Sequence, residues 1–413
     1  MIFTIIKQRL SHELSALTSI NASDRPWHLP LLAALTIALP ICFGVSMGQL
    51  DWGIQASLGA MIILNIPNPN GLSHQNRAYK NIASIWPRQA MLLGCALMMS
   101  ASFGAGLLAQ HLTKLQLPVF FGVTLSLILL GRYLRLPPPA GLFMMMAGAI
   151  ALFMPVPIAI IPSKIGTIAL GSAFAWIMAL GYHALLIWPP YTARRHLYSS
   201  PALEESDAYY ASALKQQVGY EPALISESLI VASFVTLSLA VALGLNLSHP
   251  YWVPVSCFII MQGMHLRTMW VKQLHRLLGT LVGTVVAGLL LSLALPGWGV
   301  AAAIFMMILW IETIIVRHYG LAVVIITPLT IFIAEYGHPH SQSHSELAAA
   351  TMTSIAAPIA SHQGLLQARL FDTALGCCLA LLGGVVMHSQ LIQRLLVALE
   401  SKVVKGLSGS SSD

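Results

Sequence analysis

Hydrophobic positions follow one another along this chain in long runs, and polar positions gather in short intervals between the runs. A run of about 20 apolar residues is long enough to cross the roughly 30 Å hydrocarbon core of a bilayer as a helix. The pattern therefore predicts six membrane-spanning helices in each half of the chain. The first half has spans near 28–49, 53–66, 88–110, 117–132, 139–155 and 165–188, and the second near 224–246, 252–266, 276–295, 298–316, 319–335 and 367–389.

The two halves share polar and aromatic positions. The motif Lys164-x-x-Thr167-x-Ala169-Leu170-Gly171 aligns without gaps to Arg369-x-x-Asp372-x-Ala374-Leu375-Gly376. Asp51-Trp52-Gly53 is likewise a fainter copy of Tyr251-Trp252-Val253. Because an even number of spans inserts both halves in the same direction, we expect two parallel six-helix repeats related by an axis along the membrane normal.

Composition supports a bilayer environment. The chain has 413 residues, of which 57% are hydrophobic and 8% charged, against roughly 25% charged in a soluble domain. Its formal charge is +7, but the Lys and Arg residues lie in short loops and form no stripe with interleaved aromatics, which argues against nucleic acid. We expect an all-α polytopic membrane protein with the lipid bilayer as its surroundings.

Loop charges predict the orientation. With a cytoplasmic N-terminus, the opposite side carries only Lys114, Lys164 and Arg369 near loop ends, and the positive-inside rule favours this topology with both termini cytoplasmic. The expected divisions are an amphipathic segment 1–27, a membrane repeat 28–188, a cytoplasmic linker 189–222, a second repeat 223–390 and a cytoplasmic tail 391–413.

A glycine pattern follows Arg276, which we expect to begin a span. Gly279, Gly283 and Gly288 recur at intervals of about one turn, which allows close helix approach. We expect these glycines and Gly376 to have a packing role. Arg276 itself has two open interpretations, an anchor at the cytoplasmic interface or a contact for an anion.

Glu312 and Asp372 are the acids most clearly embedded in apolar runs. An ionised carboxylate there costs about 2.5 to 3.5 kcal/mol on insertion scales, so each should face protein or a cavity. Arg369, one turn before Asp372, is its expected ion-pair partner, whereas Glu312 has no cation at suitable helical spacing. Because a carboxyl group without a partner can bind and release protons near neutral pH, Glu312 is the leading candidate for proton coupling and Asp372 the second.

Several of these residues together resemble a known family. Tyr251-Trp252, Gln262, Trp270, Arg276-x-x-Gly279-Thr280-x-x-Gly283 and Arg369-x-x-Asp372-Thr373-x-x-Gly376 look like the signature region of the fusaric acid resistance protein family. That family includes bacterial aromatic carboxylic acid efflux pumps and is similar to plant aluminium-activated malate channels. The resemblance implies an exporter of small organic acids in the bacterial inner membrane. Many members carry a large soluble domain between the halves, where this chain has only the linker 189–222.

The expected function is export of small organic acids, with aromatic acids favoured, coupled to the proton gradient. A passive organic-anion channel and a membrane scaffold or complex subunit without transport activity are the alternatives. The chain lacks a P-loop, a nucleophile elbow and a zinc-protease helix, so we expect neither catalysis nor a cofactor. The expected contacts of the organic anion are Arg276, Arg369, Trp252, Tyr251, Gln262, Arg317 and Trp310.

Two further features lie outside this function. The histidine-rich segment 335–346 matches no tetrahedral metal site in its spacing, and its Pro, Ser and Gly content is typical of a flexible loop. We therefore expect no dedicated metal site, and adventitious binding of zinc or nickel is the alternative. The glycine-rich faces are compatible with a homodimer.

Overall fold

The structure is a computed structural model that describes residues 20–23, 25–66, 85–133, 136, 139–187, 223–262, 266–336 and 356–389. The expected N-terminal amphipathic segment up to residue 19, the linker 189–222, the tail 391–413 and most of the histidine-rich segment 335–346 lie outside the described residues.

Within the described residues the chain forms twelve α-helices and no strand, and eight helices are long and apolar enough to cross a membrane. This confirms an all-α, multi-pass membrane protein. The first group is α2 (His28–Ser46), α3 (Leu50–Ala60), α4 (Ile85–Ala109), α5 (Gln116–Tyr133), α6 (Leu142–Ala151) and α7 (Ile161–Ile187). The second is α10 (Ala223–Gly244), α11 (Trp252–Met261), α12 (Leu266–Ser292), α13 (Gly297–Ile314), α14 (Tyr319–Tyr336) and α16 (Ala356–His388). Short 3-10 helices are η1 (Met61–Asn65), η4 (Thr113–Leu115) and η5 (Ile158–Ile160).

Two helices begin well before the apolar runs that predict them. Helix α12 starts at Leu266 rather than near 276, and α16 starts at Ala356 rather than near 367. Hydropathy detects only the apolar part of a helix, whereas backbone hydrogen bonding continues through polar residues. The sequence predicts that Arg276 begins a span, but in the structure Arg276 lies about three turns inside α12.

The first helix of each group ends in the same way. Gly48 and Asn246 have φ angles of 69° and 51°, in the left-handed region that few side chains tolerate. After each of them, a backbone N–H donates to the carbonyl five residues earlier, from Gln49 to Gly44 at 2.8 Å and from Leu247 to Ala242 at 3.2 Å. This bond satisfies a carbonyl at the helix end and turns the chain sharply into the next helix.

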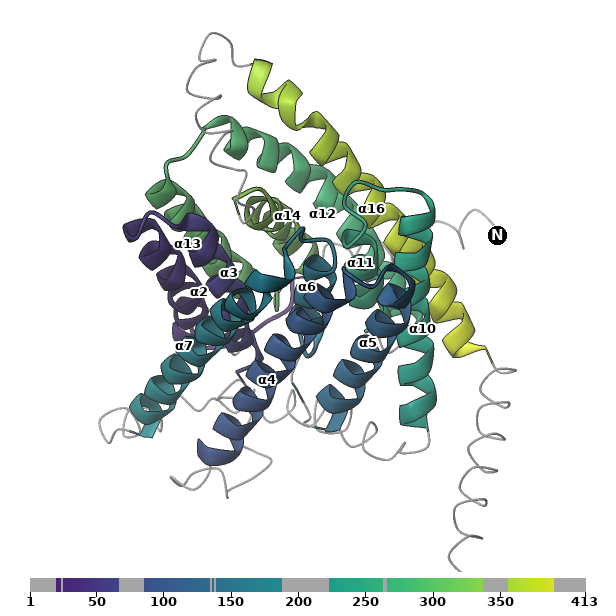
Figure 1. The fold of residues 1–413 in the computed structure, drawn as a ribbon, viewed down its shortest axis with the longest axis horizontal. Helices are drawn as coiled ribbons and strands as arrows, with labels where there is room; N and C mark the ends of the chain where they lie inside the picture. Colours follow the sequence, from purple (N-terminus) through teal and green to yellow (C-terminus); the bar gives the residue numbers. More distant parts are fainter. Residues whose placement is uncertain are drawn as a thin grey trace, which may run out of the picture.

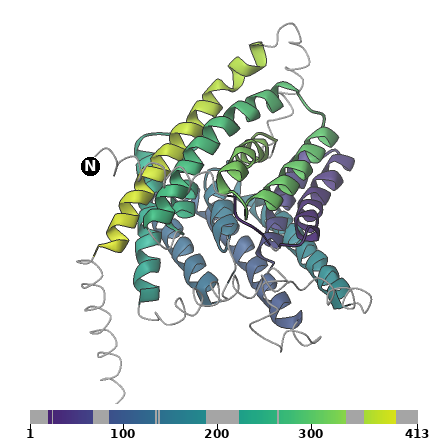
Figure 2. The same ribbon diagram turned by 180° about the vertical axis from the view of Figure 1, so that it is seen from behind.

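Within each group, two helices each pack against two others of the same group (Figure 1). Helix α3 packs against α2 and α7, and α4 packs against α6 and α7. Helix α11 packs against α10 and α16, and α12 packs against α14 and α16. The two longest of the second group, α12 and α16, run side by side obliquely across the molecule in both views (Figure 2).

The two groups meet along two seams at opposite edges. At the α2/α13 seam the first helix of the first group packs on the fourth of the second, which Figure 2 shows as purple beside green. At the α5/α10 seam the fourth helix of the first group packs on the first of the second. Between these edges α3 contacts α14 and α6 contacts α11.

Glycines allow the closest of these approaches. A Cβ atom built at Gly171 on α7 would lie 1.8 Å from the backbone oxygen of Ala56 on α3. A Cβ atom at Gly59 on α3 would in turn lie 2.1 Å from the oxygen of Ile168 on α7. Small residues at helix interfaces replace side-chain packing by direct backbone contact, as is common where lipid supplies no hydrophobic driving force between helices.

The α3–α7 contact gives a first prediction. Gly171→Ala should lower the midpoint of thermal unfolding in detergent, because the added methyl group must push the α3 backbone away, and overpacking typically costs about 1 to 3 kcal/mol. The matched control is Gly166→Ala in the same helix, where nothing lies within 4 Å of the new atom. The control should be unchanged or slightly more stable, because alanine favours helix over glycine. Equal losses in both variants would contradict the backbone contact.

Candidate functional site

Three charged side chains from α12 and α16 are buried where these helices pack on α11. Arg276 and Arg369 are each 2% exposed, and Asp372 is 1% exposed. Burying a charge in apolar surroundings is costly unless other groups compensate it. Together the three carry one net positive charge when Asp372 is ionised, because two guanidiniums face one carboxylate.

Arg276 reaches from α12 to α11 and α14. Its Nη2 atom donates to the hydroxyl oxygen of Ser256 at 3.2 Å, and its Nη1 atom lies 3.5 Å from the hydroxyl oxygen of Tyr319. Its Nε–H has no hydrogen-bond partner among the described residues. Gly279 and Gly283 bring α12 onto α14, since Cβ atoms there would lie 2.8 Å from the Gly320 oxygen and 2.6 Å from the Val324 oxygen.

Arg369 reaches from α16 to α11. Its guanidinium carbon lies 3.7 Å from the centroid of the Trp252 ring, within the range of a cation–π interaction. Its Nη2 atom donates to the Thr330 hydroxyl oxygen at 3.3 Å, and its Nε and Nη1 atoms have no hydrogen-bond partner among the described residues. The guanidinium is thus held on one face by an aromatic ring and retains unused donors at its edge.

Asp372 lies one helical turn after Arg369, and both of its carboxylate oxygens lack a hydrogen-bond partner among the described residues. Arg369 and Asp372 attract each other electrostatically, but the described residues form no direct ion pair between them, although the sequence predicts one. The reason is the direction of the Arg369 side chain, which turns to Trp252 on the neighbouring helix instead of along its own. Two oppositely charged groups therefore lie close together with free hydrogen-bonding capacity.

Aromatic and small residues complete the surroundings. Tyr251 is 5% exposed, and its ring centroid lies 5.0 Å from that of Trp252. A Cβ atom at Gly376 would lie 2.4 Å from the backbone oxygen of Val253, so α16 is held directly against the start of α11. We call Trp252, Arg276, Arg369 and Asp372, with Tyr251 beside them, the arginine cluster.

The structure does not bring every predicted contact residue into the arginine cluster. Gln262 is exposed at the end of α11, and Arg317 is exposed between α13 and α14. Trp310 is 53% exposed on the outer surface of α13. Gly288 lies farther along α12, where a Cβ atom would be 3.3 Å from Leu366.

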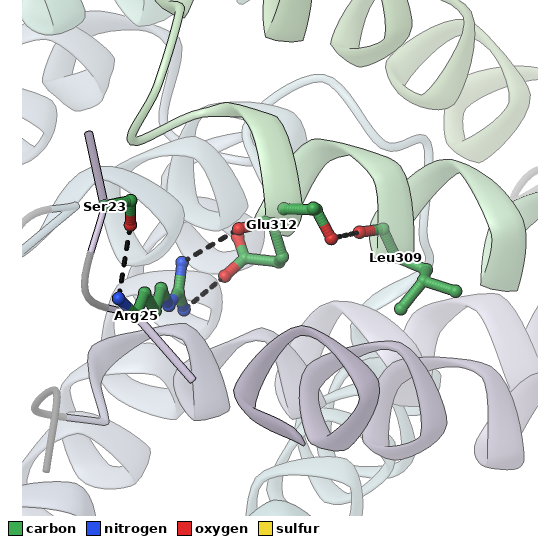
Figure 3. A network of polar contacts seen from close by, with 5 residues as sticks. Ser23, Arg25, Leu309 and Glu312 are labelled. Atoms are coloured by element: carbon green, nitrogen blue, oxygen red, sulfur yellow. Dashed lines mark hydrogen bonds and ion pairs between the residues drawn. The ribbon is translucent and has the colours of Figure 1, made fainter. Parts of the chain in front are cut away.

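Glu312 has a partner that its own helix does not supply. The Nη2 atom of Arg25, just before α2, donates to the Glu312 carboxylate at 2.5 Å, and its Nη1 atom donates to the Glu312 backbone oxygen at 3.3 Å (Figure 3). The expectation of an unpaired carboxyl group is therefore wrong. Helical spacing finds partners only within the same helix, whereas Arg25 lies 287 residues away from Glu312 in the sequence.

The ends of both seams are closed by ion pairs. At the α2/α13 seam, the ion pair of Arg25 with Glu312 is accompanied by a backbone hydrogen bond, in which the Asn21 N–H donates to the Arg317 carbonyl at 2.9 Å. At the α5/α10 seam, the Nη2 atom of Arg132 lies 3.2 Å from the carboxylate of Glu227. At the α2/α13 seam the cation lies beside the first helix of its group and the acid on the fourth helix, whereas at the α5/α10 seam the cation lies on the fourth helix and the acid on the first. Neither pair follows from helical spacing, although charged residues at helix ends are a signal for such contacts.

The remaining buried polar groups do not resemble a metal centre. Within the described ranges no three His, Cys, Asp or Glu side chains come together in a way that could hold a metal ion. His183, which is 2% exposed, has a ring nitrogen 2.8 Å from the amide nitrogen of Gln89.

The helices that carry the arginine cluster lie in the part of the chain that is similar to a known protein family. Residues 235–383 match the fusaric acid resistance protein-like family. This match confirms the resemblance that the motifs indicate, and it covers α11 to α14 entirely, most of α16 and the second part of α10. The fusaric acid resistance protein-like region thus contains Trp252, Arg276, Arg369 and Asp372.

One curated relative is an uncharacterized membrane protein, YvaC, from Bacillus subtilis (strain 168). It is 26% identical over 164 residues, which are 40% of this chain and 23% of the relative. The alignment therefore spans less than a quarter of that protein. No solved structure matches the chain.

The α2/α13 seam gives a second prediction. Glu312→Gln should lower thermal stability in detergent, measured by fluorescence-detected size exclusion after heating, because it leaves the Arg25 charge unpaired. Breaking a fully buried pair typically costs about 3 to 5 kcal/mol, and the cost should be smaller here because Arg25 is 17% exposed. The reversed pair Arg25→Glu with Glu312→Arg should recover most of the loss.

The α5/α10 seam offers the matched control. Its Arg132 and Glu227 side chains are 31% and 46% exposed, and exposed ion pairs contribute about 0 to 1 kcal/mol. Glu227→Gln should therefore have a much smaller effect. If the reversed pair at the α2/α13 seam is no more stable than Glu312→Gln alone, the ion pair is not what holds that seam.

Proposed function

We propose that the protein is a secondary transporter of the bacterial cytoplasmic membrane that exports small organic acids, preferentially aromatic ones, in exchange for protons. The observation that carries this proposal is the arginine cluster, which buries two guanidiniums beside a single carboxylate. A buried site with an excess positive charge and unused N–H donors is suited to an anion, because the ligand supplies both the missing charge and the missing acceptors.

The arrangement of helices supports a two-repeat transporter. The pairing of α3 with α2 and α7, and of α4 with α6 and α7, corresponds to that of α11 with α10 and α16, and of α12 with α14 and α16. The α2/α13 and α5/α10 seams correspond in the same way. We infer two parallel six-helix repeats, related by a pseudo-two-fold axis along the membrane normal, with both chain ends cytoplasmic.

A carboxylate substrate would bind at the edges of the two guanidiniums. Arg369 keeps two donor nitrogens and Arg276 keeps its Nε–H without partners among the described residues. Guanidinium groups recognise carboxylates through parallel N–H bonds. The Tyr251 and Trp252 rings lie directly beside these donors, and they favour substrates whose carboxylate is attached to a flat apolar body.

Asp372 is the group that we assign to the proton. In the empty, ionised site its carboxylate attracts Arg369 on the same helix, and this attraction helps to fix the position from which Arg369 contacts Trp252 on α11. A substrate carboxylate on Arg369 or a proton on Asp372 each removes the attraction. The carrier would then change state when it holds either substrate or proton and stay locked when it holds neither, which is the requirement for exchange.

Glu312 has a different role in this proposal. It pairs with Arg25 at the end of the α2/α13 seam, on the cytoplasmic side in the orientation predicted by loop charges. We assign it to closure of this seam, where the two repeats would separate if one rocks against the other during transport.

The third prediction concerns flux in inside-out membrane vesicles, where export is measured as uptake. Radiolabelled benzoate or 4-hydroxybenzoate should accumulate when a pH gradient is applied, with the vesicle interior acidic. Arg369→Gln should abolish uptake and exchange, because it removes the main carboxylate contact. Asp372→Asn should retain exchange of labelled for unlabelled substrate but lose accumulation driven by the pH gradient. Arg317→Gln is the control, since Arg317 is exposed, and it should transport normally.

Other outcomes separate the alternatives. Flux that follows the membrane potential and ignores the pH gradient would identify a passive anion channel. A folded protein without any flux across a panel of aromatic and aliphatic acids would identify a scaffold or complex subunit. If Arg317→Gln impairs uptake as strongly as Arg369→Gln, the arginine cluster is not the substrate site.

A further inference from the structure

The first group of helices contains a second place where a buried cation lies near a tryptophan. Lys164, on α7, is 7% exposed, and its Nζ atom lies 5.9 Å from the centroid of the Trp52 ring on α3. Arg369 on α16 and Trp252 on α11 form the corresponding pair in the arginine cluster. The same kind of contact therefore joins the second and the last helix of each group.

Backbone packing holds both pairs in equivalent positions. Lys164 precedes Gly171 by seven residues, as Arg369 precedes Gly376. Each glycine lies against the backbone of the helix that carries the tryptophan, at Ala56 in α3 and at Val253 in α11. Seven residues are about two helical turns, so the cation and the glycine lie on the same face of the helix. The glycine contact thus aims each cation at the start of the partner helix.

The charges around the two cations differ. Residue 51, directly before Trp52, is an aspartate, whereas Tyr251 precedes Trp252. The Asp51 Oδ2 atom lies 3.9 Å from the Lys164 Nζ atom. This distance allows attraction but exceeds that of a hydrogen bond. Thr167 stands where the second group has Asp372, and its hydroxyl donates to the Ser163 carbonyl.

Lys164 therefore has a countercharge but no close acceptor. Within the part of the chain that the structure describes, no hydrogen bond from its ammonium group is found, so its three N–H donors keep their capacity for a ligand. The Asp51 side chain is 23% exposed and Trp52 is 43% exposed. This place is therefore more open than the arginine cluster, where Trp252 is only 3% exposed.

We propose that Asp51, Trp52 and Lys164 form a second, weaker binding site for the carboxylate of a small organic anion, in which Asp51 competes with the ligand for Lys164. This inference rests on the proposed function, because it takes the substrate class from the arginine cluster. Lys164 and Asp51 together carry no net charge, whereas the arginine cluster carries one positive charge. An incoming carboxylate must displace the attraction of Asp51, which makes the site weaker and reversible. In the proposed topology Trp52 and Lys164 lie near the extracytoplasmic ends of α3 and α7, where exported anions leave.

The test measures binding of radiolabelled benzoate to the purified full-length protein in nanodiscs by equilibrium dialysis. Wild type should show a tighter and a weaker class of sites, and Arg369→Gln should leave only the weaker class. In that background, Asp51→Asn should tighten the remaining class about tenfold, because it removes the negative charge that lies 3.9 Å from the Lys164 Nζ atom at a partly exposed site. Adding Lys164→Gln to Arg369→Gln should abolish binding, whereas Lys164→Arg should keep it.

Two controls test whether binding depends on Lys164 and on the ligand carboxylate. Lys114→Gln removes an exposed lysine expected on the same side of the membrane, and it should leave both classes unchanged. Benzyl alcohol, which lacks the carboxylate, should not displace benzoate. Retention on size exclusion and an unchanged helical circular dichroism spectrum show that each variant is folded.

The outcomes distinguish this inference from the proposed function. If the weaker class persists in Arg369→Gln with Lys164→Gln, or if Asp51→Asn does not tighten it, Lys164 is not a second anion site, even when the vesicle experiments succeed. If Arg369→Gln leaves the tighter class intact, the proposed function fails. Loss of the weaker class in folded Lys164→Gln and its retention in Lys164→Arg would support the second site.

Discussion

The cost of placing charge where neither water nor lipid headgroups can reach it governs this structure. Four buried ionic groups of the described helices, Arg276, Arg369, Glu312 and Lys164, lie where helices pack and interact with a neighbouring helix or segment. Arg276 and Arg369 turn to α11, Glu312 turns to Arg25, and Lys164 turns to Asp51 and Trp52. The ionic groups therefore lie at the interfaces on which a moving repeat would act. A change in the charge of any of them changes the energy of a helix contact, and in the proposed function this change would couple ligand binding to movement.

Close backbone packing makes this burial possible. Where Gly171 and Gly376 lie against α3 and α11, the helix axes approach closely enough that a long cationic side chain spans the interface and contacts a ring on the neighbouring helix. A larger residue would separate the helices and leave the cation without its partner. The glycines are thus part of the electrostatic design of the protein, since they fix the distance over which each charge is compensated.

Features carried by short stretches of sequence were predictable. Apolar runs located the helices, and the gap-free alignment of 164–171 with 369–376 identified the cations that occupy corresponding places. Features that depend on distant parts of the chain were not. Helical spacing could not find Arg25 as the partner of Glu312. The apolar run that predicts α12 starts ten residues after the helix does, so the sequence placed Arg276 at a span end and not in the buried interior. Trp310 looked embedded because its neighbours are apolar, yet side-chain direction depends on packing.

The two groups of helices carry different charges where the sequence motifs 164–171 and 369–376 align. In the first group, Asp51 provides the countercharge of Lys164 from the start of α3, at the rim of the helix pair. In the second group, Asp372 lies on α16 itself, 1% exposed and without a hydrogen-bond partner among the described residues. A carboxylate at the rim is easily reached by solvent and by incoming ions. The interaction energy of a buried carboxylate beside an arginine, in contrast, responds strongly to any change in its surroundings. Divergence of the two halves would therefore separate two tasks, with exchange of ions in the first half and coupling of charge to movement in the second.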